Sequence, residues 1–292
     1  MRILIIGGSG MLGHKLVQVW KGRFEVFTTL KTGFEEYERF GIFEKARTLE
    51  YVDAERFESV GQAIEKVRPE VIFNAVGIIK QLPSSKNVIK TLTINSIFPH
   101  RLAEIAEKIE ARLINISTDC VFDGKKGNYK EDDISNATDV YGKSKNLGEV
   151  TGKNCLTLRT SIIGRELQTE HSLVEWFLSN RGKKVKGYVN AIYTGFPTIV
   201  LADIIADLIE NYKDLSGLYH VSAGPINKYE LLKLLNDAYR ANAEIEPFEE
   251  FQIDRSLDSN RFRNLTGFYP ASWPEMIKRM AEDPTPYDEW RK

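Results

Sequence analysis

Cysteine is scarce in this chain. Cys120 and Cys155 are the only two among 292 residues, and neither stands in a spacing typical of a metal site. Two thiols cannot build a disulfide scaffold, so we expect both to be reduced and expect no metal ion. Long hydrophobic runs are missing too: only four apolar residues separate Arg2 from the first glycines, too few for a signal-peptide core or a membrane span. These absences favour a cytoplasmic protein that does not contact a membrane.

An excess of charge of either sign is also absent. The chain has 40 Lys and Arg against 41 Asp and Glu, a formal net charge of −1, and no long basic run occurs. This balance argues against nucleic acid as the main partner. The hydrophobic fraction of 42% is ordinary for a globular protein, and the length predicts two domains or one large one.

Glycine is concentrated near the N-terminus, directly after a short apolar run. Residues 3–6 are predicted to form a buried parallel strand, and a helix is predicted from the glycines to about Trp20. Between them Gly7, Gly10 and Gly13 allow a tight turn, a close approach of pyrophosphate to the backbone, and close packing of helix on strand. A plain strand-to-helix turn is the alternative, but the position after a strand and before a helix favours dinucleotide binding. The predicted cofactor contacts here are Gly7, Ser9, Gly10, Met11 and Leu12.

The second predicted strand, residues 24–30, bears on the choice of nicotinamide cofactor. It ends without the acidic residue that hydrogen-bonds an adenosine 2′-hydroxyl, and Lys31 stands there instead, beside Thr29. A cation at this point suits a 2′-phosphate, so the sequence favours NADPH, with NADH as the second option. The alternative is that Lys31 points to solvent. The next predicted strand ends at Asp53, which with Ala54 could reach the adenine.

Strands and helices continue to alternate through residue 163, the pattern of an α/β fold with a doubly wound parallel sheet of the Rossmann type. The strand at 112–117 delivers Thr118 to its carboxyl end, the edge where open parallel sheets bind ligands. An earlier strand ends in small residues, where the cofactor ribose and pyrophosphate need close approach, and the following helix carries an asparagine. The predicted cofactor contacts in these two segments are Asn74, Ala75, Val76, Gly77 and Asn95.

Tyr141 and Lys145 are the predicted centre of the chemistry. Four residues apart on a helix, they lie on one face. The ammonium favours the phenolate and so lowers the tyrosine pKa. Tyr141 can then donate a proton to a carbonyl oxygen that the Thr118 hydroxyl helps to hold. The spacing alone is common, and it also occurs on helix faces that are merely solvated.

After residue 163 the alternation loosens. Helices are expected near 171–180 and 228–240, a helix through about Tyr212 and a strand at 217–221 return the chain to the sheet, and irregular structure with frequent prolines is expected from Asn242 onward. The predicted division is a dinucleotide-binding domain of residues 1–165, with 188–222 returning to it, and a small substrate-binding domain of residues 166–187 and 223–292.

In combination these residues resemble the extended short-chain dehydrogenase/reductase family, and within it the dTDP-4-dehydrorhamnose reductases. The segments that carry the resemblance are the glycine loop, 74–77, Asn95, 117–124, 129–132, 141–149, 158–161 and 195–198. The resemblance implies reduction of the C4 ketone of a nucleotide-activated deoxysugar, an oxidoreductase activity of polysaccharide biosynthesis that takes hydride from the nicotinamide. It implies Thr118, Tyr141 and Lys145 as catalytic residues, the last two also contacting cofactor, and Asp119 as a sugar contact.

Three positions depart from the pattern of those reductases. Cys120 stands where those reductases commonly have a tyrosine, and Ile162 stands where they have a tryptophan. Tyr193 is the first residue of a pair that replaces their usual glutamine. Without the tryptophan the sugar pocket lacks a flat wall, so the sugar stays open. Cys120 also resembles the cysteine of GDP-fucose synthase, an epimerase and reductase that pairs it with a histidine at the start of a helix, where this chain has His171. A bifunctional epimerase/reductase is therefore an alternative, although a buried apolar cysteine and a surface histidine would produce the same two residues.

The substrate diphosphate requires cations. Lys80 and Arg261 are the candidates, the latter in a cluster with two further arginines at 255 and 263, which could equally form ion pairs with Asp254 and Asp258. A non-catalytic NADP-binding regulatory subunit is a third interpretation, which the intact catalytic set disfavours. The sequence leaves the nucleotide, the sugar and a possible homodimer open.

Overall fold

The computed structural model describes residues 1–291, and the chain forms two compact units. The first comprises Met1–Ser117, Thr138–Leu158 and Ala202–Leu218; the second comprises Thr118–Ala137, Arg159–Leu201 and the described residues from Tyr219 onward. These boundaries differ from the expected domains of 1–165 with 188–222 and of 166–187 with 223–292. One reason is that Tyr129, in the stretch after strand β5 (Arg112–Thr118), bridges to Leu257 and packs with it in a small apolar cluster.

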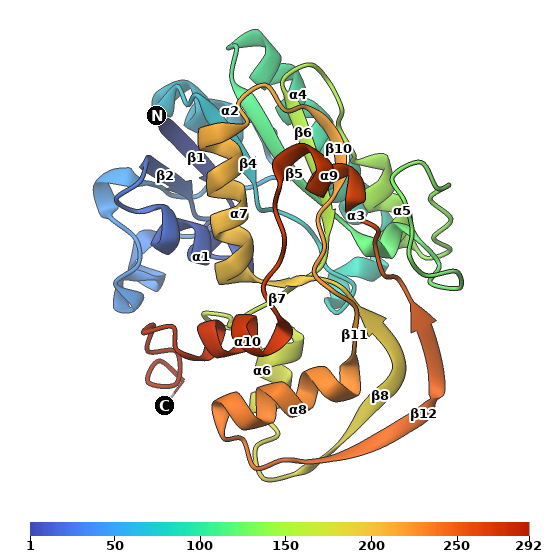
Figure 1. The fold of residues 1–292 in the computed structure, drawn as a ribbon. Coiled ribbons are helices and arrows are strands. Elements are labelled where there is room, and N and C mark those ends of the chain that lie inside the picture. The colour runs from blue at the N-terminus through green and yellow to red at the C-terminus, as the bar shows by residue number, and fades with distance from the viewer. Residues whose placement is uncertain (292) are drawn as a thin grey trace. The chain divides into compact units, whose positions relative to one another are not determined.

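A seven-stranded sheet forms the centre of the first unit (Figure 1). The strand order is β3-β2-β1-β4-β5-β6-β10, and the pairings of β1 with β2 and β4, of β2 with β3 and of β4 with β5 are parallel. In addition to β5, the strands of this sheet are β1 (Arg2–Ile6), β2 (Glu25–Thr29), β3 (Thr48–Leu49), β4 (Val71–Asn74), β6 (Cys155–Thr160) and β10 (Gly217–His220). Because the chain winds outward from β1 in both directions, this is a doubly wound α/β sheet, and the predicted fold class is confirmed.

Helices cover both faces of this sheet, so most residues of its central strands are buried (Figure 1). On one face, α2 (Phe57–Val67) and α4 (Phe98–Lys108) pack Ile64 and Leu102 against Leu4. On the other face, Trp20 ends α1 (Met11–Trp20). Its indole Nε1–H donates to the Ala202 carbonyl of α7 (Thr198–Asn211) at 2.8 Å.

The helix predicted around Asn95 is interrupted. α3 (Val88–Leu92) passes into a π-helical segment, Thr93–Ile97, which continues as α4. Such π-helical segments are rare in proteins, and those that occur are often found at functional sites. Here the segment holds α5 (Val140–Leu147): Ser96 Oγ donates to the Ser144 carbonyl at 2.8 Å, and Asn95 Nδ2 donates to Ser144 Oγ at 3.1 Å.

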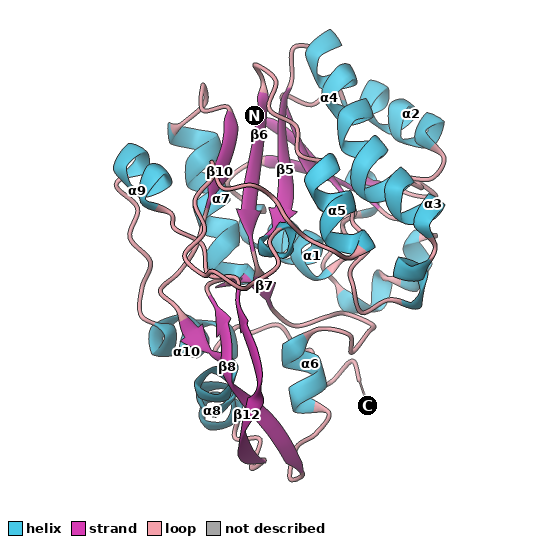
Figure 2. Cartoon of the chain, turned by 90° about the vertical axis from the view of Figure 1, so that its right-hand side faces the viewer, coloured by secondary structure: helices cyan, strands magenta, loops and turns pink. Residues whose placement is uncertain are grey.

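The second unit contains a three-stranded sheet in the order β11-β8-β12, whose two long strands β8 and β12 run side by side in Figure 2. The central β8 (Lys184–Tyr193) pairs antiparallel with β11 (Ile226–Asn227) and parallel with β12 (Glu244–Asp254). α8 (Lys228–Tyr239) packs on β8, and a Cβ on Gly187 would lie 2.7 Å from the Tyr229 ring. The other elements are α6 (Leu173–Leu178), α9 (Asn260–Thr266), α10 (Trp273–Ala281), β7 (Ile162–Ile163) and β9 (Phe196–Pro197).

The expectation of irregular structure from Asn242 onward is wrong. β12 extends over 11 residues, but it is largely exposed, rich in glutamate and interrupted by Pro247, so it lacks the apolar alternation that identifies a strand. α10 begins with a capping box in which Ser272 and Glu275 bond reciprocally, followed by a proline in its first turn. That signal is legible in the sequence.

Within residues 1–291, no helix combines the length and apolar character needed to cross a bilayer. The same part of the chain contains no gathering of three or more His, Cys, Asp and Glu side chains that could hold a metal ion. Cys120 and Cys155 are both free thiols.

Candidate functional site

The glycine loop between β1 and α1 has the geometry that close approach of a phosphate requires. Gly7 has a φ of +92°, and a Cβ on Gly13 would lie 2.1 Å from the Gly7 carbonyl oxygen. The Gly7 amide donates to the Thr29 hydroxyl at 3.0 Å, which ties the loop to β2. α1 starts directly after the loop, so its first amides have no partner within the helix and face an anion site. The predicted contacts Gly7, Ser9, Gly10, Met11 and Leu12 all lie in the loop or in the first turn of α1.

Lys31, the predicted ligand of a 2′-phosphate, is paired within the protein. Its Nζ lies 3.2 Å from Asp53 Oδ2 and 3.6 Å from Glu55 Oε2, and 58% of its side chain is exposed. The structure thus brings together two residues, Lys31 and Asp53, that the sequence assigned to different parts of the adenosine; Ala54 lies beside them, half-buried. Exposed ion pairs contribute little, so this lysine can exchange its carboxylates for a phosphate.

Two predicted cofactor contacts use their side chains inside the protein. Asn74 Nδ2 donates to Asn115 Oδ1 at 2.9 Å, and Asn74 Oδ1 accepts the Val76 amide at 3.1 Å. Asn95 Oδ1 accepts the Ile78 amide at 2.8 Å, and its amide group donates to the carbonyl of the same residue at 3.0 Å. These asparagines therefore shape the loop after β4, whose small residues Ala75 to Gly77 are at least partly exposed.

Tyr141 and Lys145 lie one turn apart on α5. Lys145 is 8% exposed, and its Nζ donates to the Ile116 carbonyl of β5 at 2.7 Å; Tyr141 is half-buried. Burial lowers the pKa of Lys145 to about 8, and the charge of Glu149 offsets part of that effect. Lys145 is therefore still mostly protonated at neutral pH.

Thr118, the last residue of β5, opens a buried polar turn in the second unit. Its Oγ1 accepts the Cys120 amide at 3.1 Å and donates to Asp119 Oδ1 at 3.2 Å. Asp119 is 7% exposed, and burial raises its pKa. Burial, followed by the charge of Asp119, raises the pKa of Cys120 to about 12. The turn therefore presents a hydroxyl and a protonated thiol rather than a thiolate.

Lys80 and Arg261, the predicted cations for the diphosphate, are each engaged in an ion pair. Lys80 Nζ lies 2.8 Å from Asp139, the N-cap residue of α5. Arg261 pairs with Asp132 and lies 3.9 Å from Glu131, and not with the aspartates that the sequence offered as partners. About half of each cationic side chain is exposed, so both pairs are weak.

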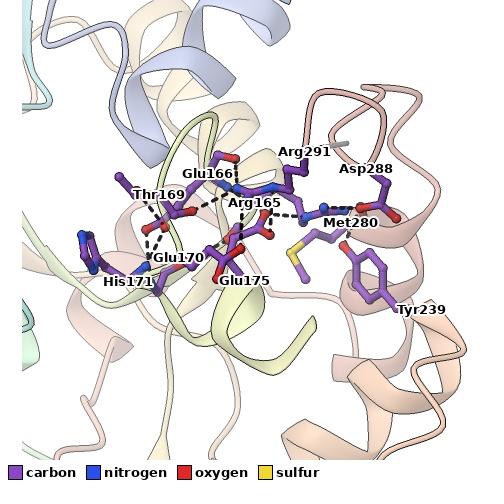
Figure 3. A network of polar contacts seen from close by, with 12 residues as sticks. Arg165, Glu166, Thr169, Glu170, His171, Glu175, Tyr239, Met280, Asp288 and Arg291 are labelled. Atoms are coloured by element: carbon purple, nitrogen blue, oxygen red, sulfur yellow. Dashed lines mark hydrogen bonds and ion pairs between the residues drawn. The ribbon is translucent and has the colours of Figure 1, made fainter. Parts of the chain in front are cut away.

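His171 is not brought to Cys120. It lies just before α6, within the polar network that ties this helix to the C-terminal tail (Figure 3). Its amide donates to Glu166 Oε2 at 2.9 Å, and its side chain is exposed. Throughout the described chain, no hydrogen bond or ion pair joins the imidazole of His171 to the thiol of Cys120.

Sequence reasoning missed Lys228 and identified Tyr193 only as a departure from a family pattern. Lys228 is the first residue of α8, half-buried, and makes no hydrogen bond or ion pair among residues 1–291. The hydroxyl of Tyr193 is buried and lacks a hydrogen-bond partner in the same part of the chain. The charge of Asp119 acts on both side chains. A signal for Lys228 exists in the sequence, since it directly follows the helix-capping Asn227.

The sequence pattern described as RmlD substrate binding domain matches residues 1–285. The dTDP-4-dehydrorhamnose reductase of Aggregatibacter actinomycetemcomitans is 26% identical over 306 residues, covering 96% of this chain and 98% of that protein. Methionine adenosyltransferase 2 subunit beta of Xenopus tropicalis is 25% identical over 313 residues, covering 95% and 89%. Among solved structures, dTDP-4-dehydrorhamnose reductase of Bacillus anthracis in complex with NADP has a TM-score of 0.78 at 21% identity, covering 96% of this chain and 98% of that one.

Proposed function

The chain belongs to the RmlD substrate binding domain family, and on this premise we propose that it is an NADPH-dependent reductase of the C4 ketone of a nucleotide-linked deoxysugar. We propose that the first unit binds the dinucleotide and the second unit the sugar nucleotide. The observation that carries the proposal is Lys145: a buried ammonium one turn from Tyr141, bonded to the backbone of the strand that ends at Thr118.

NADPH, when bound, supplies the hydride that adds to C4 of the sugar. Tyr141 donates its phenolic proton to O4 as negative charge develops there, and the ketone becomes an alcohol. Lys145 stabilises the tyrosinate that remains and can donate a second hydrogen bond to the nicotinamide ribose, because the Ile116 carbonyl uses only one of its three donors. The Thr118 hydroxyl helps to hold O4.

The residues of the first unit fit a dinucleotide phosphate chain. Gly7 has a positive φ, and Gly13, which has no Cβ, lets α1 pack closely against the Gly7 carbonyl. No side chain of these glycines therefore stands between the loop backbone and a bound pyrophosphate. Lys31, whose exposed ammonium is held by ion pairs with Asp53 and Glu55, is the residue we propose for the 2′-phosphate and so for NADPH over NADH. The complex of the Bacillus anthracis structure with NADP supports this choice.

Two alternative functions, epimerisation with reduction and a non-catalytic role, can be distinguished by experiment. Epimerisation needs a base beside the ketone, and Cys120, whose pKa burial raises to about 12, is not ionised at neutral pH. Deuterium from solvent that entered the sugar carbons next to the ketone would nevertheless establish that step. The chain also resembles a methionine adenosyltransferase subunit, which allows a non-catalytic function. Such a subunit would bind NADPH but would not oxidise it, whichever keto-sugar nucleotide was added.

Replacing Tyr141 by Phe tests the proposal. Y141F deletes the hydroxyl and keeps the ring, so turnover of NADPH with a 4-keto sugar nucleotide should fall at least ~100-fold. NADPH binding, followed by fluorescence titration, should be unchanged. The matched control is Y269F, which removes the hydroxyl of a tyrosine that is 73% exposed and should leave turnover as it is. Near-normal turnover in Y141F would remove Tyr141 from the proposed role.

A further inference from the structure

One rung of the three-stranded sheet in the second unit gathers polar side chains. Ile192 of β8 pairs with Asn227 of β11 on one side and with Asp254 of β12 on the other. Neighbouring strands lie about 4.8 Å apart, so Tyr193 and Arg255, which directly follow the paired positions of the parallel strands β8 and β12, are neighbours. Lys228 directly follows Asn227 at the end of the antiparallel β11, and the charge of Arg255 acts on it.

Asp119, in the polar turn after β5, acts electrostatically on this group. Arg255 Nη1 lies 3.8 Å from Sγ of the adjacent Cys120, and the charge of Asp119 acts on Lys228. Yet across residues 1–291 neither cation forms an ion pair with the Asp119 carboxylate. Lys228 and Arg255 are therefore near the buried carboxylate of Asp119 but do not form an ion pair with it. Arg261, the next cation along this segment, is already matched by the carboxylates of 131 and 132.

Donors in this group lack acceptors. Lys228 makes no hydrogen bond to any described residue, and Arg255 donates Nε to the Phe122 carbonyl at 2.8 Å but leaves Nη2 without a described partner. The Tyr193 hydroxyl is buried and unpaired, in a side chain that is 7% exposed. A buried donor is almost always satisfied, so the buried Tyr193 hydroxyl, beside two half-buried cations with donors to spare, indicates a position for an acceptor that the described residues do not supply.

We propose that Lys228 and Arg255, with Tyr193 beside them, form a subsite for an oxyanion of the substrate, either a carboxylate on the sugar or the diphosphate. The inference rests on the proposed function. An oxyanion offsets the surplus of two cations over one carboxylate and offers lone pairs to all three donors. A carboxylate on the sugar fits better, because Asp119 directly follows Thr118, the residue assigned to the reacting carbonyl.

Calorimetric titration of the full chain, with NADP⁺ present, tests this subsite. The probes are dTDP, UDP, UDP-glucose and UDP-glucuronate, the last two differing only by a carboxylate on the sugar. K228M removes the ammonium and keeps an apolar stem, and K228R keeps the charge. K233M is the matched control, because Lys233 lies on the same helix, half-exposed, with its charge paired to Glu230 and away from the group around Asp119.

We expect K228M to bind UDP-glucuronate about 10- to 100-fold more weakly than the wild type and UDP-glucose equally well, with K228R and K233M close to the wild type. If K228M weakens the free nucleotides and both sugars alike, the oxyanion is the diphosphate. Unchanged affinities in K228M would overturn the subsite and leave the proposed reductase intact. Failure of every nucleotide probe to bind, while NADPH still binds, would overturn both. Thermal unfolding of K228M shows whether the variant is folded, and K228R, which keeps the charge, distinguishes loss of the cation from loss of the fold.

Discussion

Replacing Lys145 by Met should stabilise the cofactor-free protein and abolish its reductase activity. The ammonium of Lys145 is buried, 8% exposed, and its only described hydrogen bond goes to the Ile116 carbonyl. An ammonium in such surroundings loses most of its hydration and gains little in return. Methionine has nearly the same length, fits irregular apolar spaces and carries no charge.

The size of the effect follows from the pKa of Lys145, which burial lowers from 10.5 to about 8. That difference corresponds to about 3 kcal/mol of unfolding free energy lost while the folded protein keeps the ammonium charged. K145M also loses a hydrogen bond worth about 1 kcal/mol. We therefore expect K145M to be more stable than the wild type by about 2 kcal/mol at neutral pH.

The sign of the pH dependence is fixed by the same shift. Between pH 8 and 10.5 the unfolded chain binds more protons at this lysine than the folded protein does, so wild-type stability rises with pH relative to K145M. The advantage of K145M is therefore fully present below pH 8 and fades as the pH rises toward 10.5. Urea unfolding from about pH 7 to about pH 10, followed by fluorescence of the buried Trp20 of the same unit, measures the difference.

The matched control is K143M, because Lys143 lies on the same helix two residues away and is exposed. Its unfolding free energy should stay within about 0.5 kcal/mol of the wild type at every pH. A K145M protein less stable than the wild type at neutral pH would contradict the reasoning. So would an advantage that did not shrink above pH 8.

Two further predictions concern stability. Gly13→Ala places a Cβ 2.1 Å from the Gly7 carbonyl oxygen, so it should destabilise the first unit by roughly 3 kcal/mol in urea unfolding and weaken NADPH binding. A Cβ on Gly61 of helix α2 would meet no atom within 4 Å, so Gly61→Ala should stabilise the protein by about 0.5–1 kcal/mol in the same assay. Glu175→Gln removes a carboxylate that is 2% exposed and bonded to two arginines (Figure 3), so it should cost about 3–5 kcal/mol. Glu170→Gln, an exposed partner of one of these arginines, should change stability by less than about 0.5 kcal/mol in the same assay; equal losses in the two variants would contradict the argument from burial.

The sequence predicts the first unit well because its signals are local. Apolar runs bounded by glycine mark elements to within a few residues, as for the strand predicted at 3–6, which is β1, and the helix predicted to end at about Trp20, which is α1. The strand expected to end at Asp53 instead ends at Leu49, as β3, and the chain adopts a positive φ of +58° at Tyr51 soon afterwards. β12 was missed because an exposed strand, paired on β8, carries no apolar alternation.

The partners of charged and polar side chains are much harder to predict from sequence. Arg261 pairs with Asp132, 129 residues earlier, and Lys80 with Asp139, 59 residues later. Asn95, predicted as a cofactor contact, bonds to Ile78 and so shapes the loop after β4. Such pairings depend on tertiary contacts, and residue types alone do not decide between an internal partner and a ligand.

Lys145 connects the stability of the protein with its proposed chemistry. The fold positions it with one backbone bond and little other compensation, and residues that cost stability in this way are concentrated at functional sites. If its ammonium tunes Tyr141, turnover should decline as the pH rises through about 8, because deprotonation of Lys145 removes the charge that stabilises the tyrosinate. Bound NADPH adds hydrogen-bond acceptors to the ammonium, so the midpoint of that decline should lie higher in kcat than in kcat/KM for NADPH. If the midpoint were the same in kcat and in kcat/KM, Lys145 would not contact NADPH, and the proposed catalytic role would not explain why it is buried.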